Sequence, residues 1–452
     1  MTWLCSLFFL ILAYFGKLIK RRWSNLLTVF AGFFGVTLFL ANFRWYGIYS
    51  ASEEALLIMF VGVVLFFLGY IIVCAIGQTK KKQISLGTFI EINEINDTHT
   101  LRINIVKVML IFALAYSIFR LYVLFALLRS GYEYIQIRTI YFNSKEMFEG
   151  ILGSIYGRNR LDVYLFQPTL LALTIISSIT FFTNALNFTQ KQKVRFVMLV
   201  FICTAFTAIS DGGREKLYYF IMIFAFCFFI VRRKQIMRGR GKLYLSKRQK
   251  RIIRVVAVVA VIAMVVITFR RYSTGGGSIQ RLLRTVYIYF TGYIPHFSIR
   301  LNELHDTDYT YGYSFILGLI KLPAAILHRV FGVPTSNAFS VAEASTSNLQ
   351  FRVDIGGGTS FNAYVGPFYY FFADLGYVSL IIESFLFGAI CAGTEQRYKA
   401  DPSCLNLFML LFCFYLIITS MVRWEMIHPK TAMMVYFIPL LFKKNCRKGN
   451  FG

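Results

Sequence analysis

Arginines and glycines stand together at two places in this chain, in patterns suited to holding an anionic group. Asp-Gly-Gly-Arg occupies residues 211–214, and an arginine followed by a glycine triplet occupies residues 352–358. Each run precedes an apolar stretch. Glycines let a backbone approach a ligand closely, and the free N–H groups at a helix start favour anions. A tight turn with Ser or Thr capping explains both runs equally well, so a turn and a pyrophosphate site are both open.

Further arginines strengthen the anion hypothesis, because a guanidinium group binds phosphate oxygens in pairs and keeps its charge. For any single arginine, contact with lipid headgroups or helix packing is the simpler explanation, whereas the set favours an anionic ligand. The candidate arginines are Arg160, Arg214, Arg281, Arg284 and Arg352. The glycines expected to allow close backbone approach are Gly212, Gly213, Gly356 and Gly357.

A hydroxyl nucleophile would also need a proton acceptor within hydrogen-bond reach. The polar stretch 270–362 offers His296, His305, Glu343 and Asp354, each of which alone is more often a surface or structural residue. We take His296 and Asp354 as the candidate bases. The eight cysteines show no metal-ligand spacing and none lies in this stretch, so we expect no metal, no disulfide framework and no cofactor.

The composition indicates an all-α, polytopic integral membrane protein that positions these residues. Hydrophobic residues make up 57% of the 452 residues and charged residues only 15%, far below the quarter usual in soluble domains. Apolar runs of suitable length predict about 11 transmembrane helices in one membrane domain, 1–452. The predicted spans are 3–16, 26–43, 55–76, 105–128, 163–186, 196–210, 216–231, 252–269, 364–392, 404–422 and 431–442.

The basic residues predict how the spans are oriented. Eleven Lys and Arg residues lie in the loop 232–254, which the positive-inside rule places in the cytoplasm. The N-terminus is then periplasmic and the C-terminus cytoplasmic. Because the basic clusters flank spans, the net charge of +27 points to anionic lipid rather than to nucleic acid. The loop 270–362 becomes a large outside loop, with short interfacial helices expected near 278–300 and 313–330. An alternative is that one of these two helices re-enters the membrane.

The chain resembles the O-antigen polymerase (Wzy-type) family of bacterial envelope enzymes. The likeness rests on many spans, one dominant outside loop and the Gly-Gly-Arg run at 212–214. It continues through 356–367 and the Ala-Asp-Leu-Gly run at 373–376, and Arg281 with Gly292 fits a spacing of some members.

This resemblance implies a metal-independent glycosyltransferase at the periplasmic face of the bacterial inner membrane. Its donor and acceptor would be oligosaccharide repeat units on undecaprenyl diphosphate, and a chain-length regulator protein is an implied partner. Arg214, Arg281, Arg284 and Arg352 would then contact the diphosphates, and Tyr287, Tyr289 and Tyr293 would stack on sugars unless they pack in the interior. The alternatives are an O-antigen ligase and a lipid-linked oligosaccharide flippase or other exporter, although acidic residues other than Glu383 are rare in the spans.

Overall fold

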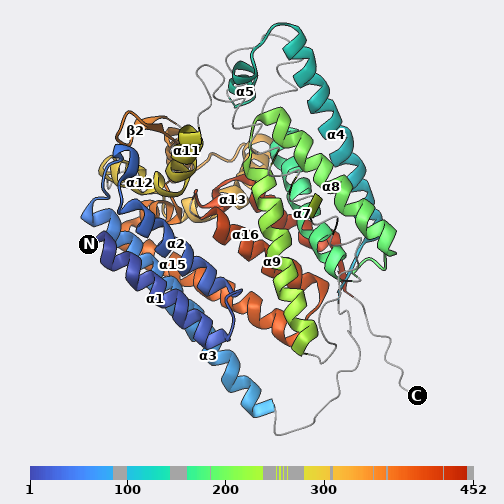
Figure 1. Cartoon of the computed structure of the whole chain (residues 1–452), viewed down its shortest axis with the longest axis horizontal. Helices are drawn as coiled ribbons and strands as arrows, with labels where there is room; N and C mark the ends of the chain where they lie inside the picture. The colour runs from blue at the N-terminus through green and yellow to red at the C-terminus, as the bar shows by residue number, and fades with distance from the viewer. Residues whose placement is uncertain are drawn as a thin grey trace. The chain divides into compact units, whose positions relative to one another are not determined.

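The computed structural model shows a chain folded mainly into α-helices (Figure 1). It describes residues 1–84, 99–142, 160–237 and 279–444 apart from residues 184, 306–308, 350, 363–364 and 421, together with residues 251, 254, 255, 258 and 262. The strands in these ranges are short: β1 (His99–Leu101) pairs antiparallel with β4 (Phe442–Lys444), and β2 (Val353–Asp354) with β3 (Ser360–Phe361). The predicted all-α class is confirmed.

Within the described ranges, seven helical segments are long and apolar enough to cross a membrane. They are α1 (Thr2–Lys20), α3 (Glu53–Ile84), α4 (Ile103–Arg129), η2 with α7 (Asp162–Phe182), α8 (Gln190–Asp211), α13 (Tyr313–Phe331) and α15 (Pro367–Ala400). Three shorter apolar helices are α2 (Leu26–Ala41), α16 (Cys404–Thr419) and α17 (Pro429–Leu441). This is the helix content of a membrane-embedded protein. The count of 11 spans stays a prediction, since the span expected at 252–269 lies largely outside the described residues.

Helix α13 covers the segment 313–330, where we expected an interfacial helix interrupted by Lys321 and Pro323. It runs unbroken over 19 residues. Pro323 lies inside the helix, and Lys321 forms an ion pair with Glu343 of α14 (Asn337–Asn348) at 2.6 Å. Few residues of α13 are buried, and the helix is apolar enough to cross a bilayer. Whether it crosses or lies at the surface depends on the topology, which stays a prediction.

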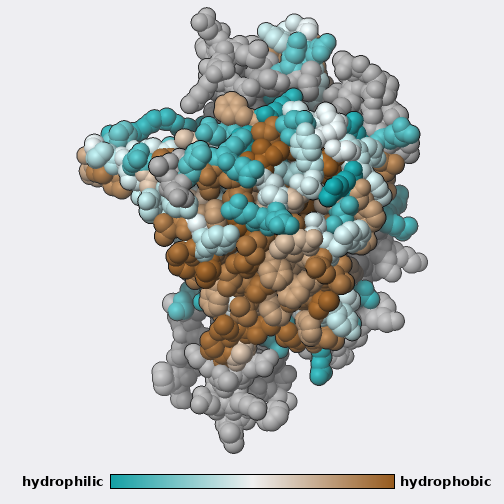
Figure 2. All heavy atoms as spheres, turned by 90° about the vertical axis from the view of Figure 1, so that its left-hand side faces the viewer, coloured by the Kyte–Doolittle hydropathy of each residue, from teal (hydrophilic) through white to brown (hydrophobic). Residues whose placement is uncertain are grey.

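The backbone contacts divide the chain into two compact units, a division that the hydropathy pattern did not indicate. Unit 1 comprises 1–96, 280–402 and 412–432, and unit 2 comprises 97–279, 403–411 and 433–452. In unit 1, the outward face of α1 carries exposed apolar side chains such as Leu4, Leu7 and Phe15. Figure 2 shows a broad apolar patch on the side of the molecule where Figure 1 draws α1. Such a surface is expected to face lipid.

Unit 1 is built around the pair α3 and α15, which pack closely because each contributes a glycine to the contact. A side chain at Gly69 of α3 would collide with the Phe385 carbonyl of α15, and one at Gly388 of α15 would collide with the Phe66 carbonyl of α3. Small residues allow this approach in membrane helices, where van der Waals contact replaces the hydrophobic effect.

Helix α15 is broken at Leu375 and Gly376, and the start of α13 packs beside this break. Gly376 adopts a φ of 60°, which interrupts the helical hydrogen bonds. Just before the break, the buried Asp374 carboxylate accepts hydrogen bonds from the backbone N–H groups of Ser314 (2.8 Å) and Phe315 (2.9 Å) and from the Thr310 hydroxyl. It therefore caps the N-terminus of α13, where a negative charge is favoured. The Ala-Asp-Leu-Gly run thus has a structural role in joining the two helices.

Unit 2 contains α4, α7 (Gln167–Phe182), α8 and α9 (Glu215–Met237), with α4 against α8 and α7 against both α8 and α9. The Ser117 hydroxyl of α4 contacts the Thr207 hydroxyl of α8 at 3.4 Å. A turn of π-helix, η2 (Asp162–Phe166), opens α7. Such turns are uncommon and often mark functional positions.

Candidate functional sites

The Gly-Gly-Arg run in unit 2 forms the turn between α8 and α9. Helix α8 ends at Asp211, and Gly212 follows in the left-handed conformation with a φ of 62°, a conformation typical of a glycine after a helix end. The Asp211 carboxylate accepts a hydrogen bond from the Gly213 N–H at 3.4 Å. The space beside Gly212 is filled by the Arg138 side chain of α5 (Tyr134–Phe142), whose Cδ would lie 2.9 Å from an added Cβ.

A buried arginine lies beside this turn. Arg120 of α4 is 1% exposed, donates a hydrogen bond to the Asp162 carboxylate at 3.2 Å, and lies 3.8 Å from the Asp211 carboxylate. Asp162 also accepts hydrogen bonds from the Tyr141 hydroxyl (2.9 Å) and from the Gln167 amide (3.2 Å). Charged side chains in membrane helices are costly unless paired and are by default functional candidates.

The remaining cations of unit 2 surround the same turn. Lys216, in the first turn of α9, forms an ion pair with Asp211. Arg214 is half-buried within the turn itself, and Arg160 is exposed two residues before η2. The structure therefore brings Arg214 and Lys216 together with the buried Arg120 and with Arg138, beside the carboxylates of Asp162 and Asp211.

The glycine triplet of unit 1 forms the tip of the β2–β3 hairpin. Gly356, Gly357 and Gly358 all have positive φ angles, of 101°, 59° and 65°. The turn is closed by hydrogen bonds between the backbones of Ile355 and Thr359 (3.0 Å) and of Thr359 and Gly356 (3.0 Å). Side chains at Gly356 or Gly357 would collide with the backbone of residues 46–49. The room at these two glycines is therefore taken by the protein itself, whereas Gly358 faces open space.

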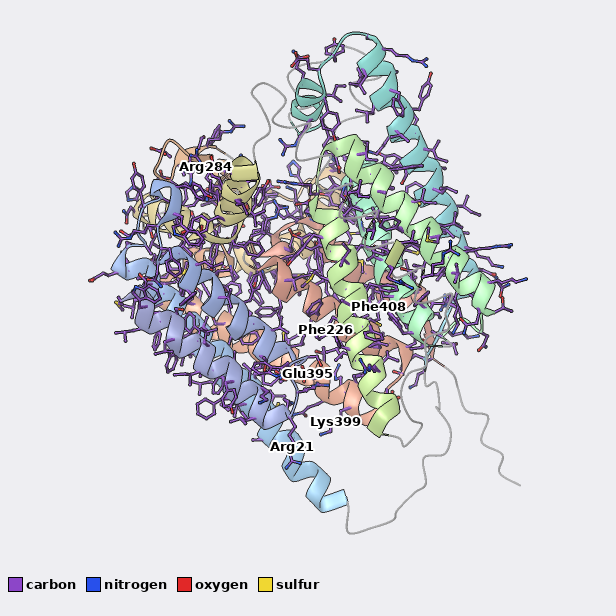
Figure 3. The ribbon with its side chains drawn as sticks, in the orientation of Figure 1. Arg21, Phe226, Arg284, Glu395, Lys399 and Phe408 are labelled. Carbon is purple, nitrogen blue, oxygen red and sulfur yellow. The ribbon has the colours of Figure 1, made fainter. Side chains whose placement is uncertain are left out.

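Arg284 of α11 (Ile279–Thr291) is fixed against this hairpin (Figure 3). Its guanidinium group donates to the Gly357 carbonyl and to the Thr359 hydroxyl, both at 2.9 Å. Arg352 is exposed at the start of the hairpin. Arg281 lies one turn before Arg284 on α11, but its side chain is outside the described residues. Arg284 and Arg352 thus lie near the same hairpin, and their binding of an anion stays a prediction.

The two candidate bases have different surroundings. His296 of α12 (Tyr293–Asn302) is fully buried and its Nε2 accepts a hydrogen bond from Arg300 at 3.3 Å. Arg300 also donates to the backbone carbonyl of Phe351 at 2.7 Å, which ties α12 to the segment before β2. Asp354, in contrast, is exposed at the hairpin, where it accepts a hydrogen bond from the Gly356 N–H at 3.0 Å.

The tyrosines proposed as sugar platforms are mostly buried. Tyr293 is fully buried, with its hydroxyl 2.9 Å from the Thr37 hydroxyl, and Tyr287 is 6% exposed and donates to the Leu40 carbonyl at 3.0 Å. Burial raises the pKa of both phenols above the ordinary value. Tyr289 is half-buried. Packing against α2 is therefore the observed role of Tyr287 and Tyr293.

Arg423, in the segment between α16 and α17, belongs to a buried ion cluster. It donates to the carboxylate of the buried Glu425 at 2.8 Å, and Lys430 lies 3.4 Å from the same carboxylate. Burial by itself would raise the pKa of Glu425, but the charges of Lys430 and Arg423, with hydrogen bonds from Arg423 and Thr431, lower it to about 2. Among the residues that the structure describes, no group of three or more His, Cys, Asp or Glu side chains is placed to hold a metal ion.

The sequence reasoning did not single out the Arg120–Asp162 pair. Its signal was available, because Arg120 is a charged residue inside the predicted span 105–128 and Asp162 stands at the edge of the span 163–186. A basic residue inside a span is as informative as an acidic one, because either charge is costly there unless it is paired.

No family model matches the sequence, and neither the curated proteins nor the solved structures include a match.

Proposed function

We propose that this protein is a glycosyltransferase that polymerises oligosaccharide repeat units carried on undecaprenyl diphosphate. The observation that carries the proposal is the Gly-Gly-Arg turn of unit 2. Arg120, Arg138, Arg214 and Lys216 gather at a glycine turn between two apolar helices. Arg120 and Lys216 face the carboxylates of Asp162 and Asp211, so Arg138 and Arg214 are the side chains of this turn that we propose hold the phosphate groups of a lipid carrier.

The reaction would transfer the growing glycan from its carrier to an incoming unit. An acceptor sugar hydroxyl attacks the anomeric carbon of the donor, a new glycosidic bond forms, and the bond between that carbon and the diphosphate oxygen breaks. The hydroxyl proton passes to a base, and undecaprenyl diphosphate leaves with its negative charge. Arginines would stabilise this charge, so the proposed reaction needs no metal clamp.

Asp354 suits the role of base better than His296. Asp354 is exposed beside Arg284 and the glycine turn, where a sugar hydroxyl can reach it. His296 is enclosed in the protein interior and receives a hydrogen bond from Arg300. A base must reach the proton that it removes, so we assign His296 to holding Arg300 and Asp354 to the acceptor hydroxyl.

We assign Arg160 and Arg214 of unit 2 to binding a lipid-linked diphosphate, and we assign Arg281, Arg284 and Arg352 of unit 1 to the same kind of ligand. We place the protein in a bacterial inner membrane, with the N-terminus periplasmic and the C-terminus cytoplasmic. The basic residues of 232–254 support this orientation. Membrane lipids and a chain-length regulator are the proposed partners.

The test is the lipopolysaccharide profile of a deletion strain. Loss of a polymerase leaves the lipid A core bearing a single repeat unit, whereas loss of a ligase leaves bare core with polymer still on its carrier. Complementation with Arg214→Ala should fail to restore long chains, while Arg129→Ala, an exposed arginine on α4, should restore them. Full-length chains in the deletion strain would refute the proposal.

One observation favours the exporter alternative. Helix α15 is broken at Gly376, and two acidic residues, Asp374 and Glu383, are buried next to the break. Broken membrane helices with acidic residues are typical of transporter binding sites. Asp374 has the structural role of capping α13, which leaves Glu383 as the residue that this alternative depends on. An exporter would give a deletion strain in which no repeat units reach the periplasm.

A further inference from the structure

An aromatic loop, residues 45–49, packs on the glycine hairpin of unit 1 and exposes three large rings. Trp45, Tyr46 and Tyr49 are 53%, 40% and 54% exposed. These residues lie in the short segment between α2 and α3, partly within η1 (Trp45–Gly47). Exposed aromatic rings are large apolar surfaces with polar edges, and they are common where a protein binds a flat ligand.

The aromatic loop is held in one conformation by the hairpin. The Tyr49 N–H donates to the Ile355 carbonyl at 2.8 Å, and Ile48 forms a backbone bridge with Gly356. Tyr46 has a positive φ of 64°, a conformation that costs energy in a residue other than glycine and persists only where the surroundings fix it. The rings are therefore presented by a fixed backbone, which reduces the entropy lost on binding.

Charged groups of opposite sign lie beside the two tyrosines. The Arg284 guanidinium is 5.9 Å from the centre of the Tyr46 ring, and the Tyr49 hydroxyl lies 3.4 Å from the Asp354 carboxylate. A carboxylate accepts hydrogen bonds from hydroxyl groups, and a guanidinium group donates to them. The surface thus combines apolar ring faces with a donor and an acceptor.

This combination matches the chemistry of a pyranose ring, which has apolar C–H faces and a rim of hydroxyl groups. We propose that Tyr46 and Tyr49, with Arg284 and Asp354, form a saccharide subsite that binds one sugar ring of the glycan. The subsite rests on the proposed function, because it names where one sugar ring of the glycan is held beside the diphosphate that we assigned to Arg284. It replaces Tyr287 and Tyr293, which are buried.

Trp45 has a different role from the two tyrosines. Its ring stacks on Phe43 at 5.3 Å, and Phe43 in turn contacts Trp3 at 5.7 Å. These rings continue onto the apolar face of α1, as expected of aromatic residues at a membrane interface. The saccharide subsite therefore adjoins the membrane surface, where a lipid-linked glycan would meet it.

The test uses full-length protein in lipid nanodiscs and an array of bacterial surface oligosaccharides that carry no lipid diphosphate. Wild-type protein should bind at least one oligosaccharide. Tyr46→Ala and Tyr49→Ala should each weaken that binding roughly 3-fold to 10-fold, the effect of losing one stacked ring. Tyr46→Trp should retain binding. Tyr122→Ala, which removes a 68% exposed tyrosine from α4, should leave it unchanged.

Several results would overturn the subsite. They are no binding by the wild-type protein, binding unchanged in both alanine variants, or a loss in Tyr122→Ala as large as in Tyr46→Ala. If brominated lipids quench Trp45 differently after Tyr46→Ala, measured in a variant that keeps Trp45 as its single tryptophan, while glycan binding is intact, Tyr46 belongs to the membrane interface and the proposal fails. Because the array contains no diphosphate, its outcome is independent of the deletion profile that tests the polymerase activity.

Discussion

The buried Arg120 makes the sharpest test of how unit 2 is held together. Replacing Arg120 with Met keeps much of the side-chain volume but removes the charge that faces Asp162 and Asp211. Asp211 keeps its ion pair with Lys216, so the larger loss falls on Asp162. Removing one partner of a buried ion pair costs about 3–5 kcal/mol, because the other charge stays buried without compensation.

A loss of this size lowers the melting temperature by roughly 6–20 °C for a unit of about 200 residues. Tryptophan fluorescence would miss it, because the four tryptophans, Trp3, Trp23, Trp45 and Trp424, all lie in unit 1. Thiol labelling during heating, read by mass spectrometry, distinguishes the units. Cys203 is fully buried in α8 of unit 2, whereas Cys5 and Cys74 are buried in unit 1. We expect Cys203 to become reactive at a lower temperature in Arg120→Met, before the cysteines of unit 1.

Two further variants test the physical cause. Arg129→Met removes an exposed arginine from the last turn of the same helix and should shift the Cys203 transition little, since exposed charges contribute little. Adding Asp162→Asn to Arg120→Met removes the uncompensated charge and should recover part of the loss. The reasoning fails if Arg120→Met behaves like Arg129→Met, or if the double variant is less stable than Arg120→Met alone.

Three other predictions concern unit 1. Gly357→Ala should destabilise the hairpin more than Gly358→Ala, because only a side chain at residue 357 collides with the aromatic loop. Both substitutions cost about 1–2 kcal/mol because both glycines have positive φ angles. The melting temperatures of the two variants check this. Asp374→Ala should cost about 1–3 kcal/mol and speed amide exchange in the first turn of α13. The pKa of Glu425 is lowered to about 2. The ionised carboxylate therefore contributes fully to the free energy of unfolding above its ordinary pKa near 4.5, and this contribution is lost as the pH falls towards 2. Glu425→Gln should be less stable at pH 7 and lack that component of acid destabilisation, which melting curves across this range would reveal.

Local sequence patterns predicted the parts of the fold that depend on local chemistry. Apolar runs located α1, α4 and α8 because hydrophobic length alone sets a membrane-type helix. The Gly-Gly-Arg turn was placed correctly between two helices because Gly212 permits the left-handed conformation that ends α8. Such features need no knowledge of distant contacts.

Contacts between distant residues were beyond that reasoning. Arg120 pairs with a residue 42 positions away, and Asp374 caps a helix that begins about 60 positions earlier in the chain. Neither partner is visible in a hydropathy pattern. The exposure of individual side chains could not be predicted from the sequence either. His296 and Asp354 were equivalent candidates as residue types, and only the packing shows that His296 is buried and Asp354 exposed.

The glycine triplet shows why a motif alone does not define a ligand site. A tight turn and the close approach of a ligand were the two expected reasons for its glycines, and the tight turn is present. Yet at Gly356 and Gly357 the approaching group is the aromatic loop of the same chain, so these two glycines cannot also admit a diphosphate from that side. Any anion at this hairpin must instead be held by side chains such as Arg284 and Arg352, with the open Gly358 as the available backbone. Substitution of Arg284 or Arg352 should therefore weaken the binding of a diphosphate, whereas substitution of Gly356 should mainly lower the stability of the fold.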